Sequence, residues 1–164
     1  MKSRKNRLLL CVLAAVTGLT YAAGEKIYDE KADAREQIAA ALKEASKSGR
    51  NVVLVFGAEW CGDCHALDEQ MHKVELASLI TKSFVVAKID VGRFDKNLDI
   101  GEKYGVPIEK GIPAIAILDS RGKLLYAQDQ GQFEDARHMS FESIKAFFEQ
   151  WKPKSRASLA PGPS

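Results

Sequence analysis

Cysteine is scarce in this chain: only Cys11, Cys61 and Cys64 occur among its 164 residues. Two of them are three positions apart, and Cys11 lies in an N-terminal segment of different character. A wider disulfide framework is therefore excluded, and the close pair can exchange only with other molecules. The sequence also lacks a Gly-rich phosphate loop and a Ser-His-Asp arrangement.

A long apolar run is missing too. The longest N-terminal one, from Leu8 to Val16, is well short of the roughly 20 residues that a membrane-spanning helix needs. Small and polar residues ending at Ala23 follow it, and four basic residues precede it, so residues 1–23 are predicted to be a cleavable secretory signal peptide. The four basic residues are Lys2, Arg4, Lys5 and Arg7. A lipid anchor at Cys11 would need a longer apolar stretch before it and a small residue in place of Leu10.

Charge of one sign is also lacking. Loss of the four basic residues, with no acidic one, changes the formal net charge from +2 to −2. The remaining lysines and arginines are scattered among acidic residues, so we expect no nucleic-acid partner.

The cysteine pair follows a continuously apolar run, residues 52–56, which is typical of a strand covered on both faces. Helical spacing begins at Gly62, so Cys61 and Cys64 are predicted to lie at the start of a helix. The free N–H groups and positive dipole end there favour a thiolate, which makes Cys61 the expected nucleophile of a redox pair. A structural disulfide is less favoured, because closing so short a ring removes little unfolded-chain entropy. However, the five residues from Cys61 to His65 also match the attachment motif of c-type haem.

Helical and strand patterns alternate along the rest of the chain. Apolar spacing predicts helices over 34–48, 62–71, 74–82, 98–104 and 140–151, and strands over 52–56, 84–89, 114–118 and 124–127. Alternating elements indicate a parallel strand pair with a crossover helix, and the last two strands form an antiparallel hairpin. We predict an α/β fold with a central mixed sheet of about four strands flanked by helices, over residues 24–151. The segment 130–139 is predicted to be a long polar loop, and residues 152–164 a disordered tail.

Three separated segments then carry a resemblance. Residues 56–64 (FGAEWCGDC), 88–90 (KID) and 111–114 (GIPA) resemble the active-site turn, second strand and cis-proline loop of the thioredoxin superfamily, in the same order. The resemblance covers residues 30–151, and among its members the chain is most similar to exported bacterial thioredoxin-like proteins, including disulfide isomerases and reductases. It implies a thioredoxin-like fold.

The resemblance also implies roles. Cys61 would attack a substrate disulfide and Cys64 would resolve the mixed disulfide. Pro113 would follow a cis peptide bond beside the thiols, and the Ile112 backbone would pair with the substrate chain. Trp60 is expected either to form part of the apolar surface around the pair or to anchor the core.

The chain departs from thioredoxin at several positions. Val55 stands where thioredoxins bury an aspartate, although the accompanying Lys88 is present, so the proton acceptor for Cys64 would be Glu59, Asp63 or a water near Lys88. Asp63 replaces the usual proline between the cysteines, and its charge is expected to disfavour the Cys61 thiolate and make the pair more reducing than that of a strong oxidase. His65, if protonated, would act the other way. The loop 104–111 is longer than its counterpart and either reshapes the substrate groove or extends the surface.

Two alternatives use the same motif. Haem attached at Cys61 and Cys64 would be ligated by His65 and by a second residue, but a motif behind a buried strand leaves no haem crevice. Zinc held by the two cysteines, His65 and His72 would require adjacent ligands that rarely fit a tetrahedral site. The main interpretation therefore involves no metal and no cofactor, with haem attachment at Cys61, Cys64 and His65 kept as the less favoured alternative and zinc as a minor one. The candidate second haem ligands are Met71, Met139 and His138.

The sequence thus predicts a monomeric periplasmic thiol-disulfide oxidoreductase that reduces or isomerises disulfides in exported proteins and is recharged by a membrane or soluble thiol electron donor. The second hypothesis is a redox protein dedicated to one client, in cytochrome maturation or metal delivery.

Overall fold

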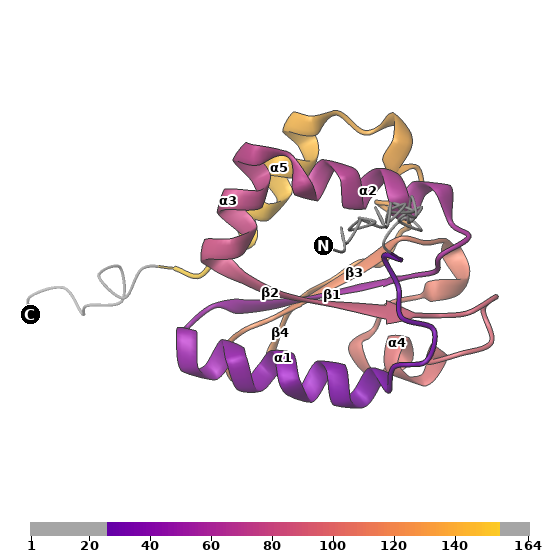
Figure 1. Ribbon diagram of the computed structural model, residues 1–164, viewed down its shortest axis with the longest axis horizontal. Helices are drawn as coiled ribbons and strands as arrows, with labels where there is room; N and C mark the ends of the chain where they lie inside the picture. The colour runs from indigo at the N-terminus through magenta and orange to yellow at the C-terminus, as the bar shows by residue number, and fades with distance from the viewer. Residues whose placement is uncertain (1–25, 155–164) are drawn as a thin grey trace, which may run out of the picture.

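A four-stranded mixed sheet lies between two layers of helices in the computed structural model, which describes residues 26–154 (Figure 1). The strands are β1 (Asn51–Gly57), β2 (Phe84–Asp90), β3 (Ala114–Leu118) and β4 (Leu124–Ala127). The α-helices are α1 (Ala34–Ser48), α2 (Gly62–His72), α3 (Val74–Ser83), α4 (Leu98–Tyr104) and α5 (Phe141–Trp151), and two short 3-10 helices are η1 (Ile108–Lys110) and η2 (Ala136–His138). The predicted α/β fold is confirmed. The predicted signal peptide, and residues 155–164 of the predicted tail, lie outside the described residues.

The sheet has the strand order β2-β1-β3-β4. Strand β1 pairs in parallel with β2, which places Val55 opposite Lys88, and antiparallel with β3. The β3–β4 hairpin completes the sheet in antiparallel fashion, as predicted for the last two strands. All seven residues of β1 are buried because it is a central strand with helices on both faces. The strand that leads to the cysteine motif is therefore enclosed along its whole length, as is its neighbour β3.

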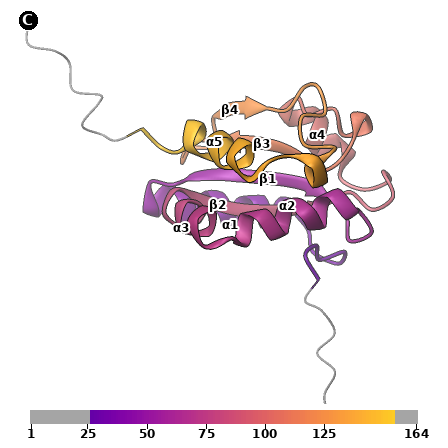
Figure 2. The ribbon, with the colours of Figure 1, turned by 90° about the horizontal axis from the view of Figure 1, so that it is seen from above.

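Helices α1 and α4 cover one face of the sheet, and α2, α3 and α5 cover the other (Figures 1 and 2). Alternate residues of β1 point into the two layers: Leu54 and Phe56 belong to the core on the α1 side, whereas Val53 and Val55 belong to the core beneath α2, α3 and α5. Helix α5 contributes Ile144 and Phe148, both fully buried, to the second core. Active-site residues that follow β1 are thus held by two cores.

The segment 130–139 differs from the predicted polar loop. Phe133 and Ala136 are each only 1% exposed, and the Phe133 ring packs edge-on against Phe147 with a centroid distance of 4.9 Å. Two apolar residues spaced three apart are enough to bury one side of the segment, and η2 forms where they turn inward. This packing holds η2 against α2, which matters for the cysteine motif.

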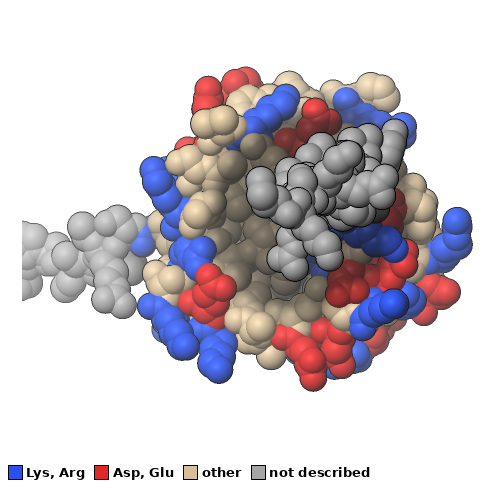
Figure 3. Space-filling view, in the orientation of Figure 1, with Lys and Arg blue, Asp and Glu red and all other residues tan. Residues whose placement is uncertain are grey.

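The surface carries mixed charge. On the face shown in Figure 3, lysine and arginine side chains alternate with aspartate and glutamate around an uncharged centre. Among residues 26–154, no helix combines the length and the apolar character needed to cross a membrane.

Candidate active site

Cys61 and Cys64 lie where β1 is connected to α2. Cys61 is the N-cap of the helix, and its Sγ accepts a hydrogen bond of 3.1 Å from the backbone N–H of Cys64. The two cysteines form a disulfide, with their Cα atoms 5.2 Å apart. Both residues are buried, at 5% and 2% exposure. The predicted placement of the cysteines at the helix start is confirmed. The backbone N–H groups at a helix start favour the thiolate form of a cysteine placed there.

The loop before β3 lies directly against Cys61. The Ile112–Pro113 peptide bond is cis, as the resemblance implies, and the carbonyl oxygen of Ile112 is 3.5 Å from Cys61 Sγ. Gln128 is buried beneath this loop and donates a 3.5 Å hydrogen bond to the carbonyl oxygen of Pro113. The edge of the loop thus faces the sulfur that a substrate would have to reach.

Trp60 is 48% exposed, so the structure places it at the surface rather than in the core. Its indole N–H donates a 2.7 Å hydrogen bond to the carbonyl oxygen of Gly92, and Phe94 packs edge-on against its ring with a centroid distance of 5.8 Å. The Arg93 guanidinium lies 5.5 Å from the same ring. Trp60 is held in place while one side remains open to a partner.

Asp63 does not stand alone between the cysteines. Its carboxylate accepts three hydrogen bonds from Arg137 in η2: 3.1 Å from the backbone N–H, 3.0 Å from Nε and 2.9 Å from a terminal nitrogen. Partial burial raises the pKa of Asp63, but these hydrogen bonds and the Arg137 charge outweigh it and hold the pKa below its ordinary value. A Cβ on Gly62 would lie 3.6 Å from the guanidinium, which therefore covers the turn between the cysteines. The negative charge expected to disfavour the thiolate is compensated by Arg137.

Replacement of Arg137 by alanine is expected to make the reduction potential more negative by roughly 10–30 mV, because the uncompensated Asp63 carboxylate disfavours the thiolate. Arg137→Lys keeps the charge without the bidentate geometry, so its potential should lie between those of wild type and Arg137→Ala. Equilibration with glutathione buffers measures the potentials of all three proteins. An unchanged potential in Arg137→Ala would contradict this role.

The Asp63–Arg137 ion pair also makes the stability of the fold depend on pH. Because the pKa of Asp63 is lowered in the folded protein, the contribution of this pair to the free energy of unfolding is fully present above the ordinary pKa of about 3.9. That contribution is lost as the pH falls through the lower pKa of the folded state.

Glu59 fastens the segment before α1 to the motif. One of its carboxylate oxygens accepts hydrogen bonds of 3.0 and 3.2 Å from the backbone N–H groups of Ile27 and Tyr28. His65 Nε2 lies 2.7 Å from the backbone oxygen of Glu59. These contacts give Glu59 a positioning role. Glu59 and Asp63 were both proposed from the sequence as proton acceptors, but the carboxylate of each already accepts hydrogen bonds from other residues.

Tyr28 lies directly beside the disulfide. It is 1% exposed, and a Cβ on Gly57 would be 2.6 Å from its Cζ and 2.8 Å from Cys64 Sγ, so ring and sulfur meet over this glycine. Burial, followed by the charges of Asp68, Asp90 and Glu59, raises the pKa of Tyr28 well above its ordinary value. The phenol therefore stays neutral at physiological pH and remains a hydroxyl donor.

Gly57→Ala is expected to destabilise the protein by about 1–3 kcal/mol, since the methyl group overlaps the Tyr28 ring and Cys64 Sγ and both must shift. The backbone of Gly57 does not require glycine, so the cost is steric. Urea unfolding measures the free energy, and Gly57→Ala combined with Tyr28→Phe, which removes the hydroxyl nearest the new methyl, serves as the control. Only partial recovery of stability is expected in the double variant, because Cζ of the ring and Cys64 Sγ still lie 2.6 and 2.8 Å from the added Cβ; an unperturbed single variant would contradict the contact.

Lys88 forms an ion pair with Asp68 of α2, and the Asp68 side chain is only 15% exposed. Asp68 follows Cys64 by four positions, so the two share a face of α2. The structure therefore places a carboxylate beside Lys88, on the helix rather than on β1, where Val55 stands.

Three residues of the site were missed by sequence reasoning: Tyr28, Asp68 and Arg137. The spacing of Asp68 from Cys64 was a readable signal, but Tyr28 precedes the first helical stripe, and Arg137 lies 74 positions from Asp63. Their roles depend on tertiary contacts that one chain segment does not reveal.

The residues named for haem or zinc are dispersed. His72 interacts with Asp68 of its own helix, His138 with Asp135, the residue before η2, and Met71 is buried in the core. Within the described part of the chain, no three His, Cys, Asp or Glu side chains are grouped so that they could hold a metal ion.

Together, the sheet order, the disulfide at the start of α2 and the adjacent cis-proline loop define a protein of the thioredoxin type. A family model described as Thioredoxin-like matches residues 33–120. A crystal structure described as a disulphide isomerase from Xylella fastidiosa Temecula1 shares 44% identity at a TM-score of 0.75, covering 78% of this chain and 98% of that one. The C-terminal domain of DsbD from Neisseria meningitidis, at 20% identity and a TM-score of 0.54 over 73% of this chain and 96% of that one, shares the fold.

Curated relatives match part of their length. The chloroplastic thioredoxin-like protein HCF164 of Oryza sativa is 34% identical over 80 residues, which are 49% of this chain and 28% of that protein. A protein disulfide-isomerase of Medicago sativa is 30% identical over 112 residues, 68% of this chain and 19% of the relative. This chain therefore spans less than a third of either protein. The chain belongs to the thioredoxin-like family, and it carries a Cys-x-x-Cys pair at the start of α2.

Proposed function

We propose that the protein is an exported oxidoreductase that reduces or isomerises disulfides in other exported proteins by way of a mixed disulfide at Cys61. The observation that carries the proposal is the position of Cys61: it caps α2, is joined to Cys64, and lies 3.5 Å from the carbonyl oxygen of Ile112 beside a cis-proline. A nucleophile at a helix start next to the backbone of the cis-proline loop suits attack on a disulfide held in an extended chain.

The first step uses the reduced pair. The Cys61 thiolate attacks one sulfur of the substrate disulfide, the substrate S–S bond breaks, and a Cys61–substrate disulfide forms. The departing substrate sulfur leaves as a thiolate and takes up a proton. The substrate backbone would lie along Ile112 and Pro113, with Trp60 forming one wall of the contact surface.

In the second step Cys64 loses its proton and attacks Cys61. The mixed disulfide breaks, the Cys61–Cys64 disulfide forms, and the second substrate sulfur leaves as a thiol, so two electrons pass from the pair to the substrate. In isomerisation, a second thiol of the substrate attacks instead and releases Cys61 as it was. Reduction needs an external dithiol donor, which would exchange with the same pair.

Asp68 is the proposed acceptor for the Cys64 proton. It lies one helical turn from Cys64, is largely buried, and is fixed by Lys88. Its charge also reaches the Tyr28 phenol, which adjoins Cys64 over Gly57, so Tyr28 or a water can link thiol and carboxylate.

The proposed location is the periplasm, on the basis of the N-terminal segment 1–23, with exported disulfide proteins as clients, a membrane or soluble thiol as electron donor and a monomeric state. No cofactor is invoked, because the thiols themselves carry the electrons. Fusion of residues 1–23 to a reporter that is active only after export tests the location: we expect export and cleavage after Ala22 or Ala23, and retention of an uncleaved fusion would contradict it.

The experiment that tests the function measures reduction of insulin and refolding of scrambled ribonuclease by the chain without residues 1–23. Its reduction potential decides the direction: a value near −270 mV or below supports a reductase, and one around −180 mV or above supports an isomerase. Cys61→Ser should abolish both activities. A wild-type protein that reacts with no disulfide would contradict the proposal.

A further inference from the structure

An apolar strip begins next to Cys61 and runs away from the disulfide. Within residues 26–154, six large hydrophobic side chains are exposed, and Trp60, Phe94 and Leu98 are three of them. Phe94 packs edge-on against Trp60, and Phe94 and Leu98 line one pocket. Phe94 has φ of 64°, a backbone conformation that is uncommon for residues other than glycine and that concentrates at binding and active sites.

The strip leads to a pocket of about 290 Å³ between the loop after β2, helix α4 and the long loop before the cis-proline. We call it the Phe94 pocket. Its apolar lining comes from Phe94, Leu98, Val106 and Ile108, and its charged lining from Glu102 and Glu109.

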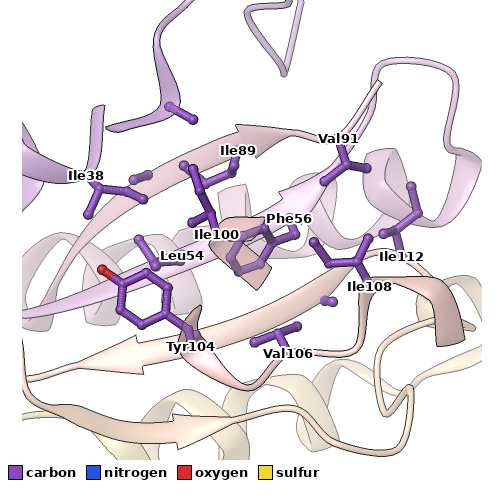
Figure 4. Close-up of a cluster of buried hydrophobic side chains, with 14 of the residues drawn as sticks. Ile38, Leu54, Phe56, Ile89, Val91, Ile100, Tyr104, Val106, Ile108 and Ile112 are labelled. Carbon is purple, nitrogen blue, oxygen red and sulfur yellow. The ribbon is translucent and has the colours of Figure 1, made fainter. Parts of the chain in front are cut away.

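The same long loop connects the pocket to the cysteines. Figure 4 shows Ile108 beside Val106 on one side and Ile112 on the other, and all three belong to one core. Ile112 in turn has its carbonyl oxygen 3.5 Å from Cys61 Sγ. The loop 104–111 is thus not a simple surface extension: Val106 and Ile108 are at most 3% exposed, and one end of the loop shapes the pocket while the other reaches the redox pair.

The charged residues that line the Phe94 pocket indicate which chemistry a bound ligand should have. Glu102 and Glu109 are exposed, and neither forms a salt bridge with any residue in the described part of the chain. The apolar walls favour burial of an apolar side chain, and two unpaired carboxylates favour a neighbouring cation. A pocket near the lower end of the usual range of roughly 300–1,000 Å³ suits a side chain or two rather than a large ligand.

We propose that the Phe94 pocket is a client subsite: it receives an apolar side chain of the substrate polypeptide, with an adjacent Lys or Arg paired to Glu102 and Glu109, while the substrate disulfide lies at Cys61. The inference rests on the proposed function and gives it a sequence preference. Clients with an acidic residue beside that apolar side chain are then disfavoured by repulsion as well as by the loss of a contact.

The test uses the reduced protein without residues 1–23 and a set of disulfide-linked peptides. Each peptide carries Leu-Lys, Leu-Glu or Ser-Lys at a stepwise-varied distance from its cysteine. The readout is the ratio, between two peptides, of the second-order rate constant at which the peptide disulfide oxidises the reduced Cys61–Cys64 pair, so that a general loss of activity cancels. We expect Leu-Lys to be favoured over both others at one particular spacing.

Two variants assign the preference to the pocket. Glu102→Gln with Glu109→Gln should lower the Leu-Lys to Leu-Glu ratio roughly threefold to tenfold, as expected for two exposed charge contacts. Leu98→Ser should lower the Leu-Lys to Ser-Lys ratio. The matched control, Glu142→Gln with Glu149→Gln on α5, changes the same number of charges on the opposite face of the sheet and should leave both ratios unchanged.

Equal ratios in wild type and both variants would overturn the subsite while leaving the oxidoreductase intact. A protein that reduces neither the peptides nor the uncharged bis(2-hydroxyethyl) disulfide would contradict the proposed function and the subsite with it. Sedimentation is the remaining check: a dimer that Leu98→Ser dissociates would mean that a second copy fills the pocket, which also overturns the proposal.

Discussion

Replacement of Cys64 by serine is expected to turn the protein into a trap for its clients. Cys61 remains at the helix start, where the N–H groups of α2 stabilise its thiolate, so it still attacks a client disulfide. The serine hydroxyl cannot displace the client from Cys61, and no third cysteine lies in residues 26–154 to replace it. Turnover should cease while mixed disulfides accumulate. Non-reducing electrophoresis and mass spectrometry of the adduct measure this outcome.

Cys61→Ser is the matched control, because it removes the nucleophile and keeps Cys64. With Cys64 only 2% exposed beneath Tyr28, this variant should form no adduct. Adducts on Cys64 would reverse the assigned order of the two thiols. Arg137→Ala in the Cys64→Ser background should form adducts more slowly, because the Asp63 charge then opposes the thiolate.

Asp68→Asn is expected to slow the second step by about 100-fold at neutral pH, the lower end of what a positioned general base contributes. Asparagine keeps the size of aspartate but does not accept the Cys64 proton. The rate should recover as the pH rises, because hydroxide then removes the proton directly. Single-turnover release of a preformed peptide mixed disulfide, followed between about pH 5 and 9, isolates this step from the first.

A loss of packing could imitate a loss of base, so two further variants separate them. Lys88→Met removes the ion pair and keeps the carboxylate, and should retain most of the rate; Asp68→Glu keeps a carboxylate and should restore part of it. If Lys88→Met were as slow as Asp68→Asn at every pH, Asp68 would act by holding Lys88 rather than by accepting a proton.

The regular elements could be predicted because each is encoded locally. The continuous apolar run 52–56 required a strand covered on both faces, and the structure extends it by only one residue at each end. The apolar spacing over residues 140–151 predicted α5 in the same way, and the structure begins this helix one residue later, with Ser140 as its N-cap. The segment 130–139 could not be read, since its packing depends on a single aromatic residue, Phe133, against Phe147 of α5.

In the site, too, the features encoded by short motifs could be predicted and those that depend on tertiary contacts could not. The positions of Cys61 and Cys64 and the cis bond before Pro113 follow from short motifs, and the structure has all three. The electrostatic environment does not: Asp63 is compensated from 74 positions away. Sequence reasoning counted charges near the cysteines along the chain, whereas the thiolate responds to charges near it in space.

The anchoring of Ile27 and Tyr28 by Glu59 has a practical consequence for anyone who produces this protein. The Ile27 and Tyr28 amides are hydrogen-bonded to Glu59, the residue before Trp60. A purification tag fused in front of residue 26 would therefore begin close to the redox motif. The described chain ends beyond α5, away from the cysteines (Figure 1). Tags belong at that end, and an activity measured with an N-terminal tag should be compared with the untagged protein before clients are ranked.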